Sequence, residues 1–433
     1  MNKRNVSRML AGLVTLILLA AVLYQIPFIH DRLAWRVTNA RAQIKYALSP
    51  PEEEIFIPGD YQGQIEAIVS ATLKALTPTA APTQTPTPDP QITPSFTPSP
   101  TLEPTPLPTQ VLLPGIQHEY QKWNNCGPAN LSMSLTYWNW DGSQLTTAPY
   151  LKPNPRDKNV MPYEMVEFVN QETELRALTR IGGTQDLLKR LLAAGYPVIL
   201  ETGFEDPREN TDFEGWMGHY EIVNAYDDQE EKFYIQDSFL GPKISSTYTN
   251  LQDRWRAFNY TWILTYPPEK EEEVMNLLGP FQDPDYAHRQ AAEIASQEIF
   301  TQSGRSKFFA WFNRGSSLVA LDDYAGAAAA YDQAFGVYAQ LDEEERPWRM
   351  MWYQTGPYWA YYYTGRHYDV LDLATKTINA SFEPAIEESF YWRARSKEAL
   401  GDISGAISDL QEALKWNEHF SAADFHLNRL LNQ

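Results

Sequence analysis

The sequence has little cysteine and none of the spacing that marks a metal site. Cys126 is the single cysteine among 433 residues, so it has no partner for an internal disulfide and, if it matters, it matters as a thiolate. The seven histidines are dispersed, and no His-Glu-x-x-His motif occurs. We therefore expect neither a metal nor another cofactor.

Runs of basic residues are also missing. The chain has 35 Lys and Arg against 55 Asp and Glu, and its net charge of -20 would repel nucleic acid and anionic lipid at long range. Nucleic acid is therefore not an expected partner. The length is too great for one ordinary domain and predicts two or three, each long enough to bury a core.

The first 29 residues are predicted to be a targeting segment. Lys3, Arg4 and Arg8 precede an uncharged, mostly apolar run at 9–29, and about 20 such residues match a hydrocarbon core roughly 30 Å thick. A cleaved signal peptide is the alternative, but the run is long for one and lacks a clean small-x-small cleavage site. We therefore expect a transmembrane signal anchor at 1–29 in a single-pass cell-membrane protein. The bulk of the chain would be extracytoplasmic, or secreted if the segment is cleaved.

Two segments that follow are not expected to build a core. Residues 30–76 are predicted to be a juxtamembrane stem that ends in an amphipathic helical pattern, with Ile65, Ile68 and Leu73 on one face. Residues 77–110 are Thr-Pro repeats, which favour extended polyproline geometry over helix or sheet. We interpret them as a linker, with a glycosylated stalk as the alternative.

Residues 111–268 are predicted to form one domain of mixed α and β structure. Pro128 fits the first turn of a helix that would place Cys126 at its N-terminus, where the helix dipole lowers the pKa of a thiol. A second helix is predicted between Thr184 as its cap and Gly195 at its end. Strands are predicted at 196–200, 218–226, 232–237 and 262–266.

Two of these strands carry residues that suit amide chemistry. His219 and Asp237 fall on the two strands of a predicted hairpin, about 4.8 Å apart, so imidazole and carboxylate can meet. A cysteine that attacks an amide needs such a base, an orienting acceptor and a donor for the oxyanion. Gln121 can supply that donor together with the backbone N–H of Cys126.

Each of these residues also has a plainer interpretation. A lone cysteine is often a small buried apolar residue, and a single histidine is by default structural. Asp227 and Asp228 are rivals of Asp237, although both have the character of turn residues. Gln117 and Asn125 are rivals of Gln121 for the oxyanion.

The order of these motifs resembles the C39-like peptidases of the papain fold. The resemblance covers roughly 111–268 and rests on three short motifs, namely Gln-x4-Cys-Gly-Pro-Ala at 121–129, Ala-Gly-Tyr-Pro-Val-Ile at 194–199, and Gly-His-Tyr at 218–220 with an Asp past the next hairpin. It implies that Cys126 is the nucleophile, His219 the general base and acid, Asp237 the orienting residue and Gln121 the oxyanion donor. Ser238 departs from the proline that many members carry there, and a long loop at 202–217 precedes His219. The chain lacks a Walker-type loop and a bundle of membrane helices, so the exporter-fused role known in this superfamily is not expected.

The C-terminal part, 269–433, is predicted to be helical throughout. Its spacing resembles tetratricopeptide (TPR) repeats, with Tyr324, Tyr368 and Ile403 at corresponding positions and an insertion in the first interval. The aromatic residues of the array are best explained by packing. Its concave face could bind a protein partner or dock on the preceding domain.

The expected fold class is therefore multidomain: an N-terminal transmembrane helix, an α+β papain-like cysteine peptidase domain, and C-terminal all-α TPR-like repeats. The expected function is hydrolysis of peptide bonds in a peptide or protein substrate through a Cys-His-Asp triad, with a repeat module for protein binding. Two alternatives remain. One is an inactive papain-like scaffold that binds peptides, and the other is an acyl or amide transferase that passes the thioester to an amine.

Overall fold

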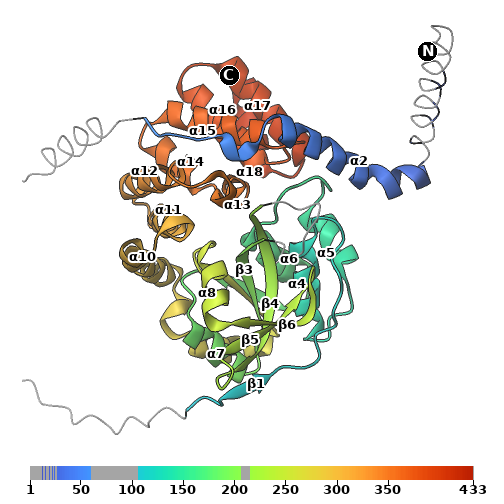
Figure 1. Ribbon diagram of the computed structural model, residues 1–433, viewed down its shortest axis with the longest axis vertical. Coiled ribbons are helices and arrows are strands. Elements are labelled where there is room, and N and C mark those ends of the chain that lie inside the picture. The colour runs from blue at the N-terminus through green and yellow to red at the C-terminus, as the bar shows by residue number, and fades with distance from the viewer. Residues whose placement is uncertain are drawn as a thin grey trace, which may run out of the picture.

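The computed structural model describes residues 12, 15, 19, 22 and 24, then 27–59, 106–205 and 215–432. Within these ranges an α/β domain is followed by a helical region, drawn in teal to yellow and in brown to red in Figure 1. The predicted amphipathic pattern at 65–76 and almost all of the Thr-Pro segment lie outside the described residues.

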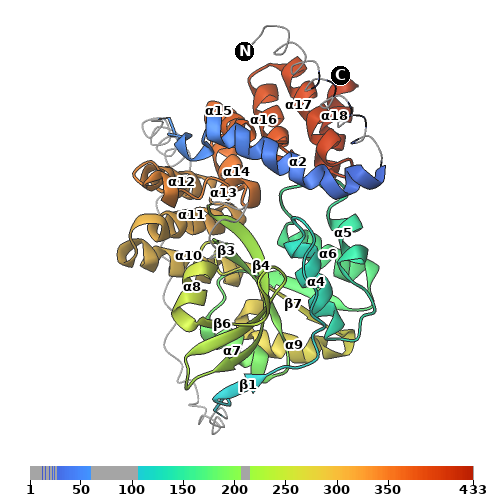
Figure 2. The ribbon, with the colours of Figure 1, turned by 45° about the vertical axis from the view of Figure 1, so that its right-hand side comes forward.

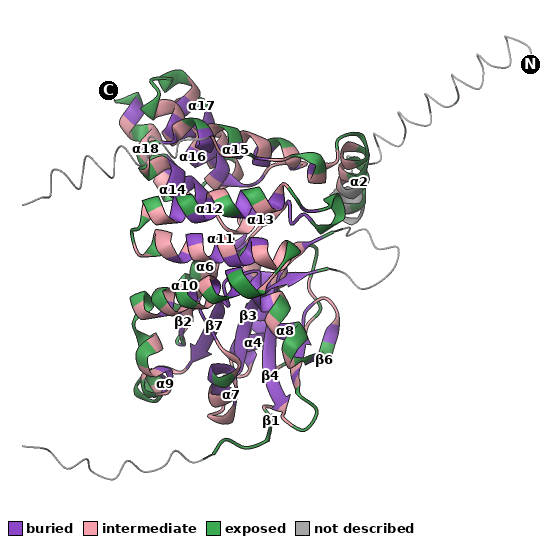
Figure 3. Ribbon diagram, turned by 60° about the vertical axis from the view of Figure 1, so that its left-hand side comes forward, coloured by how far each residue is buried: buried purple, intermediate pink, exposed green. Residues whose placement is uncertain are grey.

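One antiparallel sheet organises the α/β domain. The described strands form a seven-stranded sheet in the order β2-β7-β3-β4-β5-β6, and β1 pairs with β4 outside this path. Their bounds are β1 Gln110–Leu112, β2 Arg176–Arg180, β3 Val198–Phe204, β4 Met217–Asp227, β5 Lys232–Asp237, β6 Gly241–Thr247 and β7 Trp262–Tyr266. The most deeply buried strands in Figure 3 are the central ones, β3, β4 and β7.

Helices cover both faces of the sheet. Successive residues of a strand point to opposite faces, and in the central strands apolar residues occupy both. Val198 and Leu200 face a core with the leucines of α7, whereas Ile199, between them, faces α4 and α6. The first group of helices comprises α7 Gln185–Ala193, α8 Tyr248–Arg256 and α9 Glu271–Leu278, and the second comprises α4 Cys126–Thr136, α5 Gln144–Leu151 and α6 Pro162–Glu172. The nucleophile candidate thus begins a helix packed against the centre of the sheet.

The elements predicted around the candidate residues are confirmed. Thr184 caps α7 by accepting a hydrogen bond from the Leu187 N–H, and Gly195 follows the helix with a φ of 94°. The strands predicted at 232–237 and 262–266 have those bounds in β5 and β7. β1, β2 and β6 were not predicted, because β1 has only three residues and the burial of β2 and β6 does not alternate regularly along the strand.

From residue 284 onward the chain is helical, as predicted, and its helices pack in successive antiparallel pairs (Figure 1). Whether these pairs are tetratricopeptide repeats stays a prediction. The helices are α10 Pro284–Thr301, α11 Gly304–Ala320, α12 Tyr324–Tyr338, α13 Met350–Tyr353, α14 Gly356–Tyr363, α15 His367–Ala380, α16 Glu387–Ala399, α17 Ile403–Trp416 and α18 Ser421–Leu431. Short 3-10 turns lie at η1 Pro51–Glu53, η2 Pro268–Lys270, η3 Gly279–Gln282 and η4 Glu343–Glu345.

The predictions of a transmembrane helix and of a single-pass membrane location are wrong. Within the described part of the chain, no helix is both long enough and apolar enough to span a bilayer. Most of the predicted anchor lies outside the described residues. The described helix α2, Pro27–Leu48, begins near the C-terminal end of the predicted anchor segment. The sequence of α2 includes Asp31, Arg36 and Lys45 among its charged residues, which disfavour a place in hydrocarbon.

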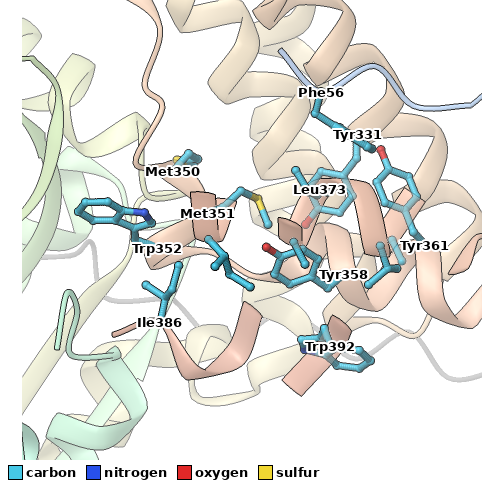
Figure 4. Close-up of a cluster of buried hydrophobic side chains, with 14 of the residues drawn as sticks. Phe56, Tyr331, Met350, Met351, Trp352, Tyr358, Tyr361, Leu373, Ile386 and Trp392 are labelled. Carbon is cyan, nitrogen blue, oxygen red and sulfur yellow. The ribbon is translucent and has the colours of Figure 1, made fainter. Parts of the chain in front are cut away.

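Instead, residues 27–59 form a strap along the helical region (Figure 2). The Lys45 ammonium donates to the carbonyl oxygens of Asn379 and Ser381, at 2.6 and 2.7 Å. Phe56 is only 4% exposed, and its ring lies 4.8 Å from that of Phe335. Figure 4 shows Phe56 beside Tyr331 and Tyr361, within the buried cluster of the helical region.

The same apolar cluster extends into the α/β domain. Trp216, just before β4, stacks on Phe258 with ring centroids 5.8 Å apart and lies 5.6 Å from Phe309 of α11. Polar bonds reinforce the junction: the Asn313 side chain donates to the Arg256 carbonyl at 2.7 Å. The two parts of the chain therefore share a continuous core instead of a loose contact.

Candidate active site

Cys126 is the first residue of α4, as predicted. Its neighbour Asn125 is the N-cap and makes no side-chain capping bond, so Cys126 lies at the positive end of the helix dipole with no side chain capping the first turn. Asn124 has a φ of 53°, a left-handed conformation that reverses the chain just before the helix. This local geometry favours the negatively charged form of the cysteine.

His219 and Asp237 are brought together as the hairpin predicted. Nε2 of His219 lies 3.1 Å from Oδ1 of Asp237, and the two residues are 4% and 1% exposed. The same Oδ1 accepts bonds from the backbone N–H groups of Phe239 and Leu240, at 2.7 and 2.9 Å. Burial alone would raise the pKa of Asp237, but His219 and these amides lower it to about 2. Asp237 is therefore a carboxylate at neutral pH.

The thiol of Cys126 and the imidazole of His219 line the same pocket, and each shifts the pKa of the other. Burial tends to raise the pKa of Cys126, yet hydrogen bonding to His219, the imidazole charge and a backbone bond from Tyr220 lower it below its usual value. Burial tends to lower the pKa of His219, but Asp237 and Cys126 raise it to about 10. Since Nε2 faces Asp237, Nδ1 is left for the sulfur. The shifts have the signs expected of a thiolate–imidazolium pair.

Gln121 lines the same pocket as Cys126, and its side-chain carbonyl oxygen accepts a hydrogen bond from the protein itself. The Ser238 hydroxyl donates to Oε1 of Gln121 at 2.7 Å, and the Gln121 N–H donates to the Ser238 carbonyl at 2.8 Å. This leaves the amide NH2 group of Gln121 as the donor available to a ligand. The rivals Gln117 and Asn125 are not among the residues that line the pocket.

Three supporting residues were missed by sequence reasoning. Ser238, at the position where many members of the resembling family carry proline, is hydrogen-bonded to Gln121. Asn130 Nδ2 lies within 2.9 Å of the carbonyl oxygens of Cys126 and Tyr220 and of the Ser238 hydroxyl. The buried ammonium of Lys152 donates to the Asn124 carbonyl at 2.6 Å. Asn130 lies close to the Cys-Gly-Pro motif and could have been suspected, but nothing in the sequence marks Lys152.

The pocket around Cys126 is small, with a volume of about 60 Å³. Its walls are mainly apolar, and one of them, Tyr353, comes from α13 of the helical region. Glu201 of β3 also lines it, and burial raises the pKa of this carboxyl well above its usual range. In the described ranges, no group of three or more His, Cys, Asp or Glu is arranged to hold a metal ion.

Comparison with known proteins assigns the α/β domain. Residues 113–263 match the model of the Peptidase_C39 like family. They are thus a C39-like peptidase domain, and the match supports a papain-like peptidase fold. A search of curated proteins finds no match. A crystal structure described as a C39-like peptidase from Bacillus anthracis is similar to this chain at 16% identity, covering 36% of this chain and 96% of its own, with a TM-score of 0.30.

Proposed function

We propose that this protein is a cysteine peptidase that hydrolyses peptide bonds in a peptide or protein substrate. The observation that carries the proposal is the convergence of Cys126, His219 and Asp237: imidazole and carboxylate lie 3.1 Å apart, and the thiol lines the same pocket as the imidazole, which lowers the pKa of the thiol. The family of the domain gives independent support.

In the proposed mechanism, the Cys126 thiolate attacks the carbonyl carbon of the scissile amide. The resulting oxyanion accepts bonds from the Gln121 amide and the Cys126 N–H. His219 gives its proton to the leaving nitrogen as the C–N bond breaks, which releases an amine and leaves a thioester. Water then attacks the thioester while His219 takes its proton, and the acid departs as the thiol is restored. Asp237 keeps the imidazole oriented throughout.

The test compares the wild-type chain with Cys126→Ala and His219→Ala. Iodoacetamide should label wild-type Cys126 rapidly well below pH 8, because its pKa is lowered, and His219→Ala should lose this low-pH labelling. Cleavage of a peptide library, followed by mass spectrometry, should occur with wild type and not with folded Cys126→Ala. Equal cleavage by both proteins would contradict the proposal.

The same assay separates the two alternatives. An acyl or amide transferase would yield amide products when an amine is added, whereas a peptidase yields free acids. A binding scaffold would show slow labelling that rises only near an ordinary thiol pKa of about 8.5, with peptide affinity retained. For the helical region we propose TPR-like repeats that bind protein, supported by its successive antiparallel helix pairs.

A further inference from the structure

A groove of about 1200 Å³ lies beside the candidate active site. Asn124, Lys158, Met217 and Tyr353 line both the groove and the small pocket around Cys126, so the two are continuous. The groove is walled on one side by the peptidase domain, on another by the strap at 27–59, and on a third by η4 and α13 of the helical region. A chain entering it would therefore touch three separate parts of the protein.

Tyr353 fixes one end of the groove to the catalytic strand. Its ring lies against Gly218, the residue before His219, and both residues line the pocket around Cys126. A Cβ atom on Gly218 would lie 2.9 Å from the Tyr353 ring and 2.7 Å from that of Phe258, so this close approach requires glycine. The helical region thereby forms part of the wall of the catalytic pocket.

Aromatic side chains line the body of the groove. Trp348 lies between Tyr46 of the strap, at 5.5 Å between ring centroids, and Trp352, at 5.0 Å. Figure 4 shows Trp352 projecting away from the other labelled residues of the buried cluster. Trp123, three residues before Cys126, is 39% exposed. Such surfaces suit the side chains of an extended polypeptide.

Charged side chains of both signs line the groove: Lys158, Arg305, Arg346 and Arg349, and Glu52, Glu205, Glu343, Glu344 and Glu345. Its arginines are bonded to the protein itself: Arg305 to Glu205 and to the Glu345 carbonyl, Arg346 to the Glu52 carbonyl at 2.7 Å, and Arg349 to the Trp216 carbonyl at 2.8 Å. The carboxylates of Glu343, Glu344 and Glu345 are exposed, and none of them forms an ion pair with a described residue. Glu343, Glu344 and Glu345 thus form a local run of exposed negative charge on one wall of the groove, on a chain whose net charge is -20.

We propose that this groove is the substrate cleft and that it binds an extended polypeptide segment whose basic side chains lie opposite Glu343, Glu344 and Glu345. The role of the groove in cleavage rests on the proposed peptidase function. Its selectivity in binding does not, and it can be measured without turnover.

The test uses the full chain carrying Cys126→Ala, which cannot cleave. Two fluorescein-labelled peptides of identical length, one with several lysines and one with glutamates at the same positions, are titrated by fluorescence anisotropy. The basic peptide should bind about tenfold more tightly or better at low salt, and this advantage should shrink as salt is added. Replacing all three residues by E343Q, E344Q and E345Q should remove most of it.

A matched control exists in α9, which begins with Glu271, Glu272 and Glu273 and does not line the groove. The same three Glu→Gln changes there should leave the preference intact. Equal affinity for both peptides, or a preference that survives in the groove variant, overturns the proposal. If the basic peptide binds selectively but wild type cleaves nothing, the peptidase proposal fails and the cleft proposal stands. If wild type cleaves peptides but the chain binds basic and acidic peptides equally, the peptidase proposal stands and the cleft proposal fails.

Discussion

At the scale of single residues, the candidate site depends on side chains that hold other side chains. Ser238 fixes the Gln121 carboxamide so that its NH2 group faces the pocket. The four proposed reacting residues could be chosen from the sequence because their types suit amide chemistry and because short motifs carry them. Ser238 and Lys152 could not, since a serine or lysine acquires such a role only through contacts made across the fold.

Lys152 provides a prediction about charge at the nucleophile. Burial raises the pKa of Cys126, whereas His219 and, more weakly, the buried ammonium of Lys152 lower it. In Lys152→Met the positive charge is lost, so the pH at which iodoacetamide labelling is half-maximal should rise. Lys152→Arg keeps the positive charge, so its labelling midpoint should stay close to that of wild type.

A purely structural role for Lys152 would give a different result. Its bond to the Asn124 carbonyl also holds the loop before the helix. If that bond were its whole contribution, Lys152→Met would lower the labelling rate at every pH without moving the midpoint. The shape of the pH profile, not the rate at one pH, therefore decides between the two roles.

At the scale of elements, a strong local pattern made prediction possible. α7 has leucines on one face, a threonine cap and a glycine end, and β5 and β7 have apolar residues in short runs, so all three were predictable. β2 and β6 have little pattern of their own and depend on their neighbours. The anchor prediction was wrong because, in the described residues, no helix is long and apolar enough to span a bilayer, and the charged helix α2, which begins within the predicted segment, packs on the helical region.

The beginning of β4 gives a prediction at this scale. Gly218→Ala would force a Cβ atom against Phe258 and Tyr353, so it should destabilise the protein by about 1–3 kcal/mol and lower activity by displacing His219. Gly336→Ala is the control, because this glycine in α12 has open space around its Cβ position. There alanine should stabilise by about 0.5–1 kcal/mol. Urea unfolding measures both, and equal effects would contradict the packing described at Gly218.

At the scale of the whole molecule, the shared core joins what the sequence suggests are separate modules. The Trp216 ring contacts Phe258 from one part and Phe309 from the other. Such contacts join residues far apart in the sequence, and no local periodicity reports them. The continuity of the core predicts that the peptidase domain and the helical region lose structure together when the protein unfolds.

The strap allows a matched stability measurement. Phe56 is buried against the helical region, whereas the next residue, Ile57, is 72% exposed. Phe56→Ala should reduce the free energy of unfolding by about 3–5 kcal/mol. Ile57→Ala should change it by less than about 0.5 kcal/mol. A small effect of Phe56→Ala in urea unfolding would mean that the strap is not part of the folded core.

Because the strap is docked, the Thr-Pro segment connects two points of the same folded unit. Gly59 at the end of the strap is bonded to Asp369, and Gln110 at the start of the peptidase domain is paired with Asp227, so the chain between them is anchored at both ends. A protease that cuts within 60–105 should therefore leave a nicked two-chain complex, held by Lys45 and Phe56, instead of releasing a free peptidase. Lengthening this segment should cost little stability, because the entropy of closing a loop grows only with the logarithm of its length.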